Sequence, residues 1–194
     1  MTSSTNYYDQ NAQRFFEGTV DVDMSKLYEH FLPLIPAGGS ILDAGCGSGR
    51  DALAFQNNGY DVTAVDASKE LCKLASALLR KPVQCIVFNE IVSHKAFDAV
   101  WACASLLHVP KVELSDSIKA LIRSLKSSGV MYCSFKWGDK ERMVDSRLFT
   151  DMTDKSFKDL MSEISPSALV ETWITEDQRP GRDEKWLNAL ITIV

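Results

Sequence analysis

Residues 41–50 have the sequence Ile-Leu-Asp-Ala-Gly-Cys-Gly-Ser-Gly-Arg, and this stretch decides the fold of the 194-residue chain. Its apolar first half is typical of a short buried strand, and the glycines on alternate positions predict a tight turn that opens a helix. Glycine tolerates positive φ and has no Cβ, so a ligand can approach the backbone closely. The start of the following helix offers unpaired N–H groups. Together these features predict a nucleotide-type binding site.

The spacing of the glycines separates the known kinds of nucleotide loop. The dinucleotide fingerprint is Gly-x-Gly-x-x-Gly. If the fingerprint starts at Gly45, Arg50 stands in place of its third glycine. If it starts at Gly47, Ala52 stands there. Alanine is tolerated there, so the spacing argues against a nicotinamide dinucleotide site but does not exclude one. A P-loop is excluded because no Gly-Lys-Ser/Thr follows. What remains, Asp-x-Gly-x-Gly-x-Gly after an apolar strand, resembles motif I of the class I S-adenosyl-L-methionine (SAM) dependent methyltransferases.

A second strand that ends in an acid supports this resemblance. The segment Asp61–Asp66 is typical of a strand, and it ends about 20 residues after the glycine turn, where nucleotide-binding folds place a carboxylate on the ribose hydroxyls. The resemblance implies that Asp66 binds the ribose of SAM and that Asp43 suits the cationic part of SAM. The alternative for Asp66 is a helix-capping acid, although Ser68 fits that position better.

The segment 97–110 closely resembles the fourth-strand motif of the same methyltransferases. It contains Phe-Asp-Ala-Val-Trp, then the small residues Ala102 to Ala104, then a Leu-His pair that ends at His108. The resemblance implies that the small residues let SAM lie against the strand end. It also implies that His108 lies near the methyl group, where a histidine can act as a base near neutral pH. A structural histidine that bonds a neighbouring loop is the alternative.

The resemblance also implies contacts to the adenine and a lid over the cofactor. After an expected strand at Val83–Phe88, Phe88 would lie beside the adenine plane and Asn89 at its edge, where the family commonly has aspartate. The N-terminal segment 1–36 is expected to be helical and to close over SAM through Tyr8 and Arg14, with simple docking of its aromatic residues on the core as the alternative. The expected SAM-binding residues are Tyr8, Arg14, Asp43, Gly45, Gly47, Gly49, Asp66, Ala67, Phe88, Asn89 and Ala102.

Two further segments are expected at the ligand end of the sheet. Residues 136–150 are polar and charged, and we interpret them as an insertion on the substrate side, while residues 175–184 are expected to form a loop. Arginine binds carboxylate or phosphate bidentately, so we expect a small, anionic methyl acceptor, with solvated loop arginines as the alternative. The expected acceptor-binding residues are Trp137, Arg142, Arg147, Arg179, Arg182 and Trp186.

The order of the expected elements predicts the fold class. Strands alternate with helices up to the fifth strand, Val130–Phe135, which predicts a parallel, doubly wound sheet in one domain. The strands at 169–174 and 186–194 are joined without a helical pattern, which favours an antiparallel pair. This matches the α/β, Rossmann-like sheet that the resemblance implies, with seven strands, mostly parallel, and the last strand antiparallel. The resemblance covers nearly the whole chain and is closest to the small single-domain methyltransferases related to tellurite resistance.

Composition limits the class of protein further. The net charge of −5 argues against a general nucleic-acid binder, which usually needs a basic face. No apolar run approaches membrane-spanning length, and the N-terminus lacks the pattern of a signal peptide. The five cysteines occur singly, so we expect no metal centre and a reducing, cytoplasmic location, with Cys85 and Cys133 buried in apolar runs. We expect a monomer or a homodimer.

The predicted activity is methyl transfer from SAM to a small acceptor, which leaves S-adenosyl-L-homocysteine (SAH). Three alternatives stay open. A nicotinamide-dependent oxidoreductase would need a second domain or a Tyr-x-x-x-Lys pair, and the sequence offers neither. An RNA or protein methyltransferase would usually carry a recognition domain, or an Asn/Asp-Pro-Pro-Tyr-like motif where Ala102–Ser105 stands. A SAM-binding protein without catalysis would bind the cofactor and methylate no acceptor.

Overall fold

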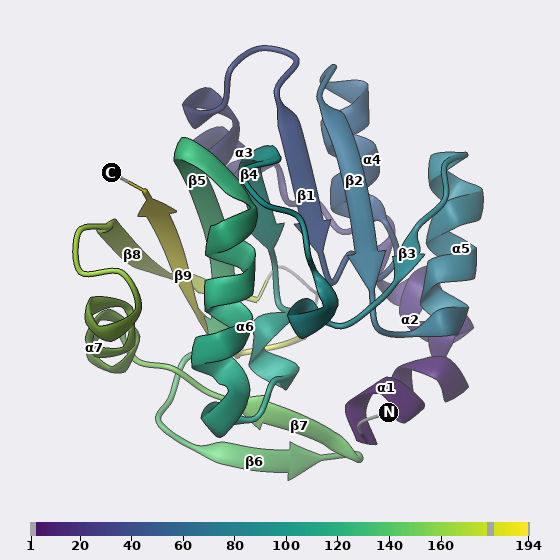
Figure 1. The fold of residues 1–194 in the computed structure, drawn as a ribbon. Coiled ribbons are helices and arrows are strands. Elements are labelled where there is room, and N and C mark those ends of the chain that lie inside the picture. The colour runs from purple at the N-terminus through teal and green to yellow at the C-terminus, as the bar shows by residue number, and fades with distance from the viewer. Residues whose placement is uncertain (1–2, 178–180, 194) are drawn as a thin grey trace.

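The computed structural model describes residues 3–177 and 181–193 of the chain (Figure 1). Its centre is a sheet of seven strands, and two further strands form a separate hairpin. The sheet strands are β1 (Ser40–Ala44), β2 (Asp61–Asp66), β3 (Gln84–Cys85), β4 (Phe97–Ala102), β5 (Leu125–Lys136), β8 (Leu169–Glu176) and β9 (Lys185–Thr192). The hairpin strands are β6 (Glu141–Val144) and β7 (Arg147–Thr150).

The strand order in the sheet is β3-β2-β1-β4-β5-β9-β8. The ladders from β3 to β5 are parallel, whereas β9 pairs antiparallel with both β5 and β8. The order reverses at β1, and in open α/β sheets ligands bind beyond the carboxyl ends of the strands at such a point. The predicted fold class is therefore confirmed: a Rossmann-like α/β sheet, mostly parallel, with the last strand antiparallel.

Helices cover both faces of the sheet, and Figure 1 shows α6 in front of it. The helices are α1 (Ser3–Gln10), α2 (Ala12–Thr19), α3 (Ser25–Phe31), α4 (Arg50–Asn57), α5 (Lys69–Leu79), α6 (Lys111–Ser124) and α7 (Asp154–Ile164). Short 3-10 turns are η1 (Leu32–Leu34), η2 (Phe88–Glu90) and η3 (Leu106–His108). Within the described ranges, no helix has the length and apolar character needed to cross a membrane.

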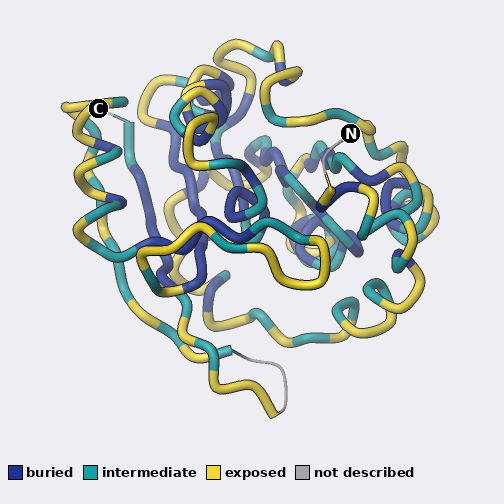
Figure 2. The backbone as a smooth tube through the Cα atoms, turned by 90° about the horizontal axis from the view of Figure 1, so that it is seen from below, coloured by how far each residue is buried: buried dark blue, intermediate teal, exposed yellow. Residues whose placement is uncertain are grey.

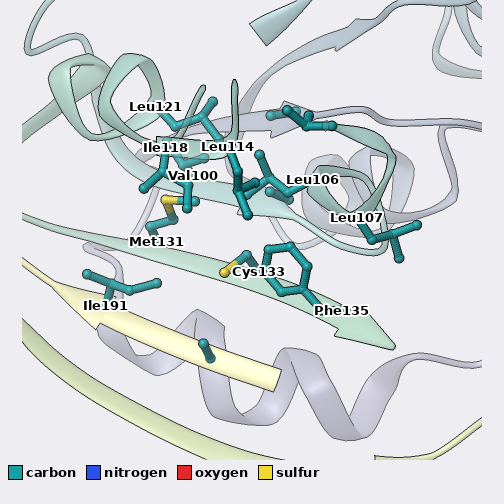
Figure 3. Close-up of a cluster of buried hydrophobic side chains, with 14 of the residues drawn as sticks. Val100, Leu106, Leu107, Leu114, Ile118, Leu121, Met131, Cys133, Phe135 and Ile191 are labelled. Carbon is teal, nitrogen blue, oxygen red and sulfur yellow. The ribbon is translucent and has the colours of Figure 1, made fainter. Parts of the chain in front are cut away.

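Two buried clusters hold these layers together. One joins α6 to the sheet through residues that include Leu114 and Ile118 (Figure 3). The other joins α3, α4 and α5 to the sheet through Phe31, Phe55 and Ala75. Full burial of one large apolar side chain contributes roughly 1.5–3 kcal/mol, so these clusters are the main source of stability. Figure 2 shows the buried backbone in dark blue through the interior, with exposed segments in yellow around it.

Two sequence-based predictions, on the third strand and on Cys85, differ from the structure. The strand expected over Val83–Phe88 is shorter, because β3 pairs with β2 over only two residues before the chain turns into η2. Cys85 is therefore exposed, and the prediction that it is buried is wrong, whereas Cys133 is buried as expected. The N-terminal segment begins with two helices, since Asn11, with φ −117°, separates α1 from α2.

Helix α1 and the β6–β7 hairpin lie at the same edge of the sheet, at the bottom of Figure 1, toward which the parallel strands point. The Leu148 N–H donates to Ser4 Oγ over 2.9 Å, which fixes α1 to the hairpin. At the other end, Asp9 Oδ1 accepts bonds from Ser68 Oγ at 2.6 Å and from Glu70 N at 3.1 Å. The helix thus spans from the hairpin to the start of α5. That the segments 1–36 and 136–150 close over a ligand stays a prediction.

Candidate active site

A cavity of about 610 Å³ lies at this edge of the sheet. Small-molecule and cofactor sites commonly enclose roughly 300–1,000 Å³. The lining residues come from α1, from the glycine turn after β1, from the segments that follow β2 and β4, from η2, and from the β6–β7 hairpin and β9. Predicted SAM-binding residues and predicted acceptor-binding residues therefore line one continuous cavity.

The glycine turn fits its place only because two of its residues lack a Cβ. Gly45 has φ +80°, and a Cβ built there would lie 2.4 Å from Ser105 Cβ. Gly47 has φ +55°, and its Cβ would lie 3.1 Å from Phe15 Cε1. Both backbones are in the left-handed region, which disfavours other residues. The N–H groups of Gly45 and Cys46 both donate to the Val65 carbonyl, at 2.8 and 2.9 Å, and these bonds fix the turn to β2.

Asp66 presents a half-buried carboxylate to the cavity at the end of β2. Its Oδ2 accepts a bond from the Gly47 N–H at 2.8 Å, and its Oδ1 accepts one from the Ser68 N–H at 2.8 Å. Burial raises the pKa of Asp66, although these backbone donors oppose the shift. Each carboxylate oxygen has a second lone pair, so further donors such as hydroxyl groups would stabilise the charged form.

Asp43, the other predicted acid, lies beneath the turn and does not line the cavity. Its Oδ2 is buried without a hydrogen-bond partner among the described residues. Burial raises the pKa of Asp43 well above its usual range, and the nearby charge of Asp51 adds to the shift. The raised pKa disfavours the charged form of Asp43, so a role for this acid toward the cationic part of SAM stays a prediction.

Asp51, in the first turn of α4, is a site residue that the sequence analysis missed. It lines the cavity and accepts bonds from Tyr28 Oη at 2.6 Å, from Trp101 Nε1 at 2.8 Å and from Arg50 Nε at 2.6 Å. Burial alone would raise the pKa of Asp51, but Arg50 and the other donors outweigh burial and lower it. The network fixes the Arg50 side chain at the cavity wall. An acid directly after the glycine turn was the available signal.

His108 is bonded at both ring nitrogens. Nδ1 lies 2.7 Å from the Leu148 carbonyl oxygen, which can only accept, so Nδ1 carries the proton. Nε2 then accepts the bond from Tyr8 Oη, also at 2.7 Å. Burial, together with the charges of Arg147 and Lys136, lowers the pKa of His108 to about 4 although the bond to Leu148 opposes this. The imidazole is therefore neutral at pH 7, and its lone pair is held by Tyr8.

The lowered pKa makes His108 a measurable source of pH dependence. Between the ordinary value of 6.5 and the folded value of about 4, the unfolded chain binds the proton and the folded protein does not. The associated stability is thus complete above pH 6.5 and is lost as the pH falls to 4; at about 1.4 kcal/mol per pKa unit the loss is about 3 kcal/mol. We expect the wild type to lose this much more than His108→Gln across that window, as measured by urea unfolding. As a control, His94→Gln, at an exposed position, should lose as much stability as the wild type. An equal loss of unfolding free energy between pH 6.5 and 4 in the wild type and in His108→Gln would contradict the assignment.

The structure brings most, but not all, of the predicted residues to the cavity. The predicted SAM-binding residues that line it are Tyr8, Gly45, Gly47, Asp66, Ala67, Phe88 and Asn89. Gly49 and Ala102 lie outside the lining, as Asp43 does, and Arg14 is exposed. The predicted acceptor-binding residues that line it are Arg142, Arg147, Arg182 and Trp186. Trp137 is 43% exposed and lies outside the lining, and Arg179 lies outside the described residues.

Lys136 is a second cavity residue that the sequence analysis missed. It ends β5 with only 9% of its surface exposed and pairs with Glu184, which directly precedes the neighbouring strand β9. Its Nζ lies 4.7 Å from the centroid of the Phe149 ring. The signal was a charged residue at the end of the buried run 129–136, although we expected residue 136 to belong to the insertion.

This strand order, with a glycine turn after β1 and an acid after β2, is the architecture of the Rossmann-like methyltransferases. Residues 42–133, from β1 to β5, match the family described as a methyltransferase domain. The match and the relatives below support placing the chain among the class I SAM-dependent methyltransferases.

Curated relatives share part of the chain. An uncharacterized methyltransferase of Staphylococcus carnosus is 31% identical over 93 residues, which cover 48% of this chain and 45% of that protein. A ubiquinone biosynthesis O-methyltransferase of Xanthomonas oryzae is 33% identical over 105 residues, which cover 50% of this chain and 43% of that protein. The chain thus spans less than half the length of the curated relatives that it matches.

Solved structures share the fold over the whole chain. The 1,6-didemethyltoxoflavin-N1-methyltransferase of Burkholderia thailandensis, solved with its substrate and SAH, has a TM-score of 0.81 at 18% identity, covering 99% of this chain and 88% of that one. The cyclase SpnF has a TM-score of 0.78 at 15% identity, covering 100% of this chain and 97% of that one. Because these two proteins are named for different reactions, the shared fold does not by itself define the chemistry.

Proposed function

We propose that the chain is a SAM-dependent methyltransferase that acts on a small, anionic acceptor. The observation that carries the proposal is the Asp66 carboxylate, held at the cavity by the N–H groups of Gly47 and Ser68. Burial raises the pKa of this acid and so disfavours its charged form. Hydroxyl donors from a ribose would stabilise the charged carboxylate further. The methyltransferase-domain match over residues 42–133 supports the same cofactor.

The chain's own residues suit the parts of SAM. The turn at Gly45 and Gly47 leaves the backbone open to a ligand, and Phe88 and Asn89 line the neighbouring wall, where an adenine would lie. SAM supplies a methyl group on a sulfonium, which leaves as a neutral thioether. The protein then needs mainly to align the acceptor and exclude water, and alignment can contribute roughly 7–11 kcal/mol. Closure of the cavity by α1 serves both purposes.

Several features support a small acceptor over RNA or protein. Helix α1 lines the cavity, and its Tyr8 is bonded to His108 of η3, which also lines it. The Burkholderia thailandensis neighbour is named as an N1-methyltransferase of 1,6-didemethyltoxoflavin. The arginines at the β6–β7 hairpin support an anionic acceptor. Membership of the tellurite-resistance group, a cytoplasmic location and the oligomeric state stay predictions from the sequence.

Calorimetric titration with SAH beside NADH tests the cofactor. We expect SAH to bind with a micromolar dissociation constant and NADH not to bind, because Asp66 offers an acceptor to ribose hydroxyls and the turn lacks the dinucleotide spacing. Binding of NADH alone would contradict the proposal. Retained SAH binding, with no methyl transfer from labelled SAM to any of a panel of small acids, would identify a SAM-binding protein without catalysis.

A further inference from the structure

The ring of Phe149 in β7 is the centre of a cluster of cations at the acceptor end of the cavity. Lys136 Nζ lies 4.7 Å from the ring centroid, and the Cζ atoms of Arg142 and Arg147 lie 5.4 and 5.3 Å from it. All three side chains line the cavity. The His108 ring lies 4.9 Å from the same ring, so the cluster borders the histidine that the family resemblance places near the methyl group.

Carboxylates of the chain neutralise two of these three cations. Lys136 pairs with Glu184. Arg142 is held bidentately by Asp151, at 2.8 and 3.3 Å, and the Asp151 side chain is only 8% exposed. Such a fork-to-fork pair is strong and directional, so it leaves little of the Arg142 charge for a ligand.

Arg147 differs from the other two. Its carboxylate partner is Asp145, at 3.4 Å, whose side chain is 71% exposed, and exposed pairs of this kind contribute little. Its Nε is buried and finds no hydrogen-bond acceptor among the described residues. A buried donor without a partner costs free energy, which an acceptor group on a ligand would recover. Of these three cations, Arg147 is therefore the one whose carboxylate partner is mostly exposed and whose charge is least compensated.

The surroundings hold the Arg147 guanidinium in place. Its Cζ lies 4.4 Å from the centroid of the Tyr7 ring, so a residue of α1 covers one side of it. Arg147 directly follows a two-residue hairpin turn in which Asp145 and Ser146 have φ +49° and +65°. Turns of this kind match the twist of the strands and fix their register. The guanidinium is therefore positioned before any ligand binds.

We propose that Arg147 binds a carboxylate group of the methyl acceptor. The proposal rests on the proposed function and adds which group of the acceptor the protein recognises. A guanidinium presents two parallel N–H donors that match the two oxygens of a carboxylate. A single positive charge balances a carboxylate, whereas a phosphate carries about −1.5 to −2 charges at pH 7. The aromatic rings of Tyr7 and Phe149 beside the guanidinium favour a planar acid.

Titration of the SAH-saturated protein with sodium benzoate, and separately with its neutral analogue benzamide, tests this proposal. We expect benzoate to bind the wild type, and to bind Arg147→Gln at least about tenfold more weakly, because the bond to a charged group is lost. Arg147→Lys, which keeps the charge without the fork, should lie between the two. Arg123→Gln, on the exposed side of α6, removes the same charge elsewhere and should behave as the wild type. SAH affinity should be the same in all four proteins.

Three results would overturn the proposal: equal benzoate affinity in the wild type and Arg147→Gln, binding of benzamide as tight as that of benzoate, or tighter binding of phenyl phosphate than of benzoate. Failure of the proposed function is distinguishable from these results. If the wild type binds no SAH, the cofactor assignment fails, and the same benzoate comparison on the free protein still decides whether Arg147 binds carboxylates.

Discussion

Replacement of Asp51 with alanine is expected to lower the free energy of unfolding by about 3–5 kcal/mol, the range for loss of one partner from a buried ion pair. The substitution leaves the half-buried Arg50 guanidinium without its carboxylate, which accepts bonds at 2.6 and 2.9 Å. It also removes the acceptor for two further donors, Tyr28 Oη and Trp101 Nε1. Buried donors without a partner add to the cost. Urea unfolding of the ligand-free protein measures the effect.

Two comparisons make the Asp51 result specific. Asp51→Asn keeps the size of the side chain and removes its charge, so we expect an intermediate loss. Asp116→Ala removes a carboxylate that is 76% exposed and lies 3.6 Å from Lys119, and this change should leave stability almost unaltered. A loss below about 1 kcal/mol for Asp51→Ala, which is ordinary for any point substitution, would show that the network does not stabilise the fold.

Replacement of Asp66 with alanine is expected to weaken SAH binding by about a hundredfold or more. Two hydroxyl bonds to one carboxylate are each worth roughly 1.5–3 kcal/mol, and every 1.4 kcal/mol is a factor of ten in affinity. The substitution also frees the N–H groups of Gly47 and Ser68, which now donate to Asp66. Calorimetric titration with SAH measures the effect.

The Asp66 experiment needs a control for loss of structure. Thermal unfolding of Asp66→Ala shows whether the glycine turn still assembles. Asp61→Asn changes an acid at the opposite end of β2, which is 75% exposed beside Lys81, and SAH affinity should stay unchanged there. Near wild-type SAH affinity in a folded Asp66→Ala protein would remove Asp66 from the cofactor site.

The parts of the fold predicted from the sequence are those with local signals. The apolar run into the glycine turn, and the acid that ends Asp61–Asp66, each lie within one continuous segment, and the structure has both as predicted. Strand β3 is shorter than predicted because its extent depends on pairing with β2, which hydrophobicity does not encode. Likewise, the turn of the β6–β7 hairpin uses Asp145 and Ser146, which lack the usual glycine signal.

Contacts between distant parts of the chain define the rest of the site, and the sequence could not reveal them. The bond from Tyr8 to His108 joins residues 100 positions apart, and the bond from His108 to Leu148 joins residues 40 apart. Lys136 ends β5 and Glu184 directly precedes β9, and three strands and a helix separate these two positions along the chain. Such pairs depend on how the strands are ordered in the sheet. The residue type at each of these positions alone would equally fit a solvated loop.

The two ends of the cavity have separate origins along the chain. The glycine turn, Asp66 and η2 all lie within the 42–133 match, whereas α1, the β6–β7 hairpin and β9 lie outside it. Substitutions or insertions in the β6–β7 hairpin and β9 can therefore change the proposed acceptor end without altering the glycine turn or Asp66. An ancestral cofactor-binding unit could acquire new acceptors in this way, one peripheral segment at a time, without passing through a form that has lost its methyl donor.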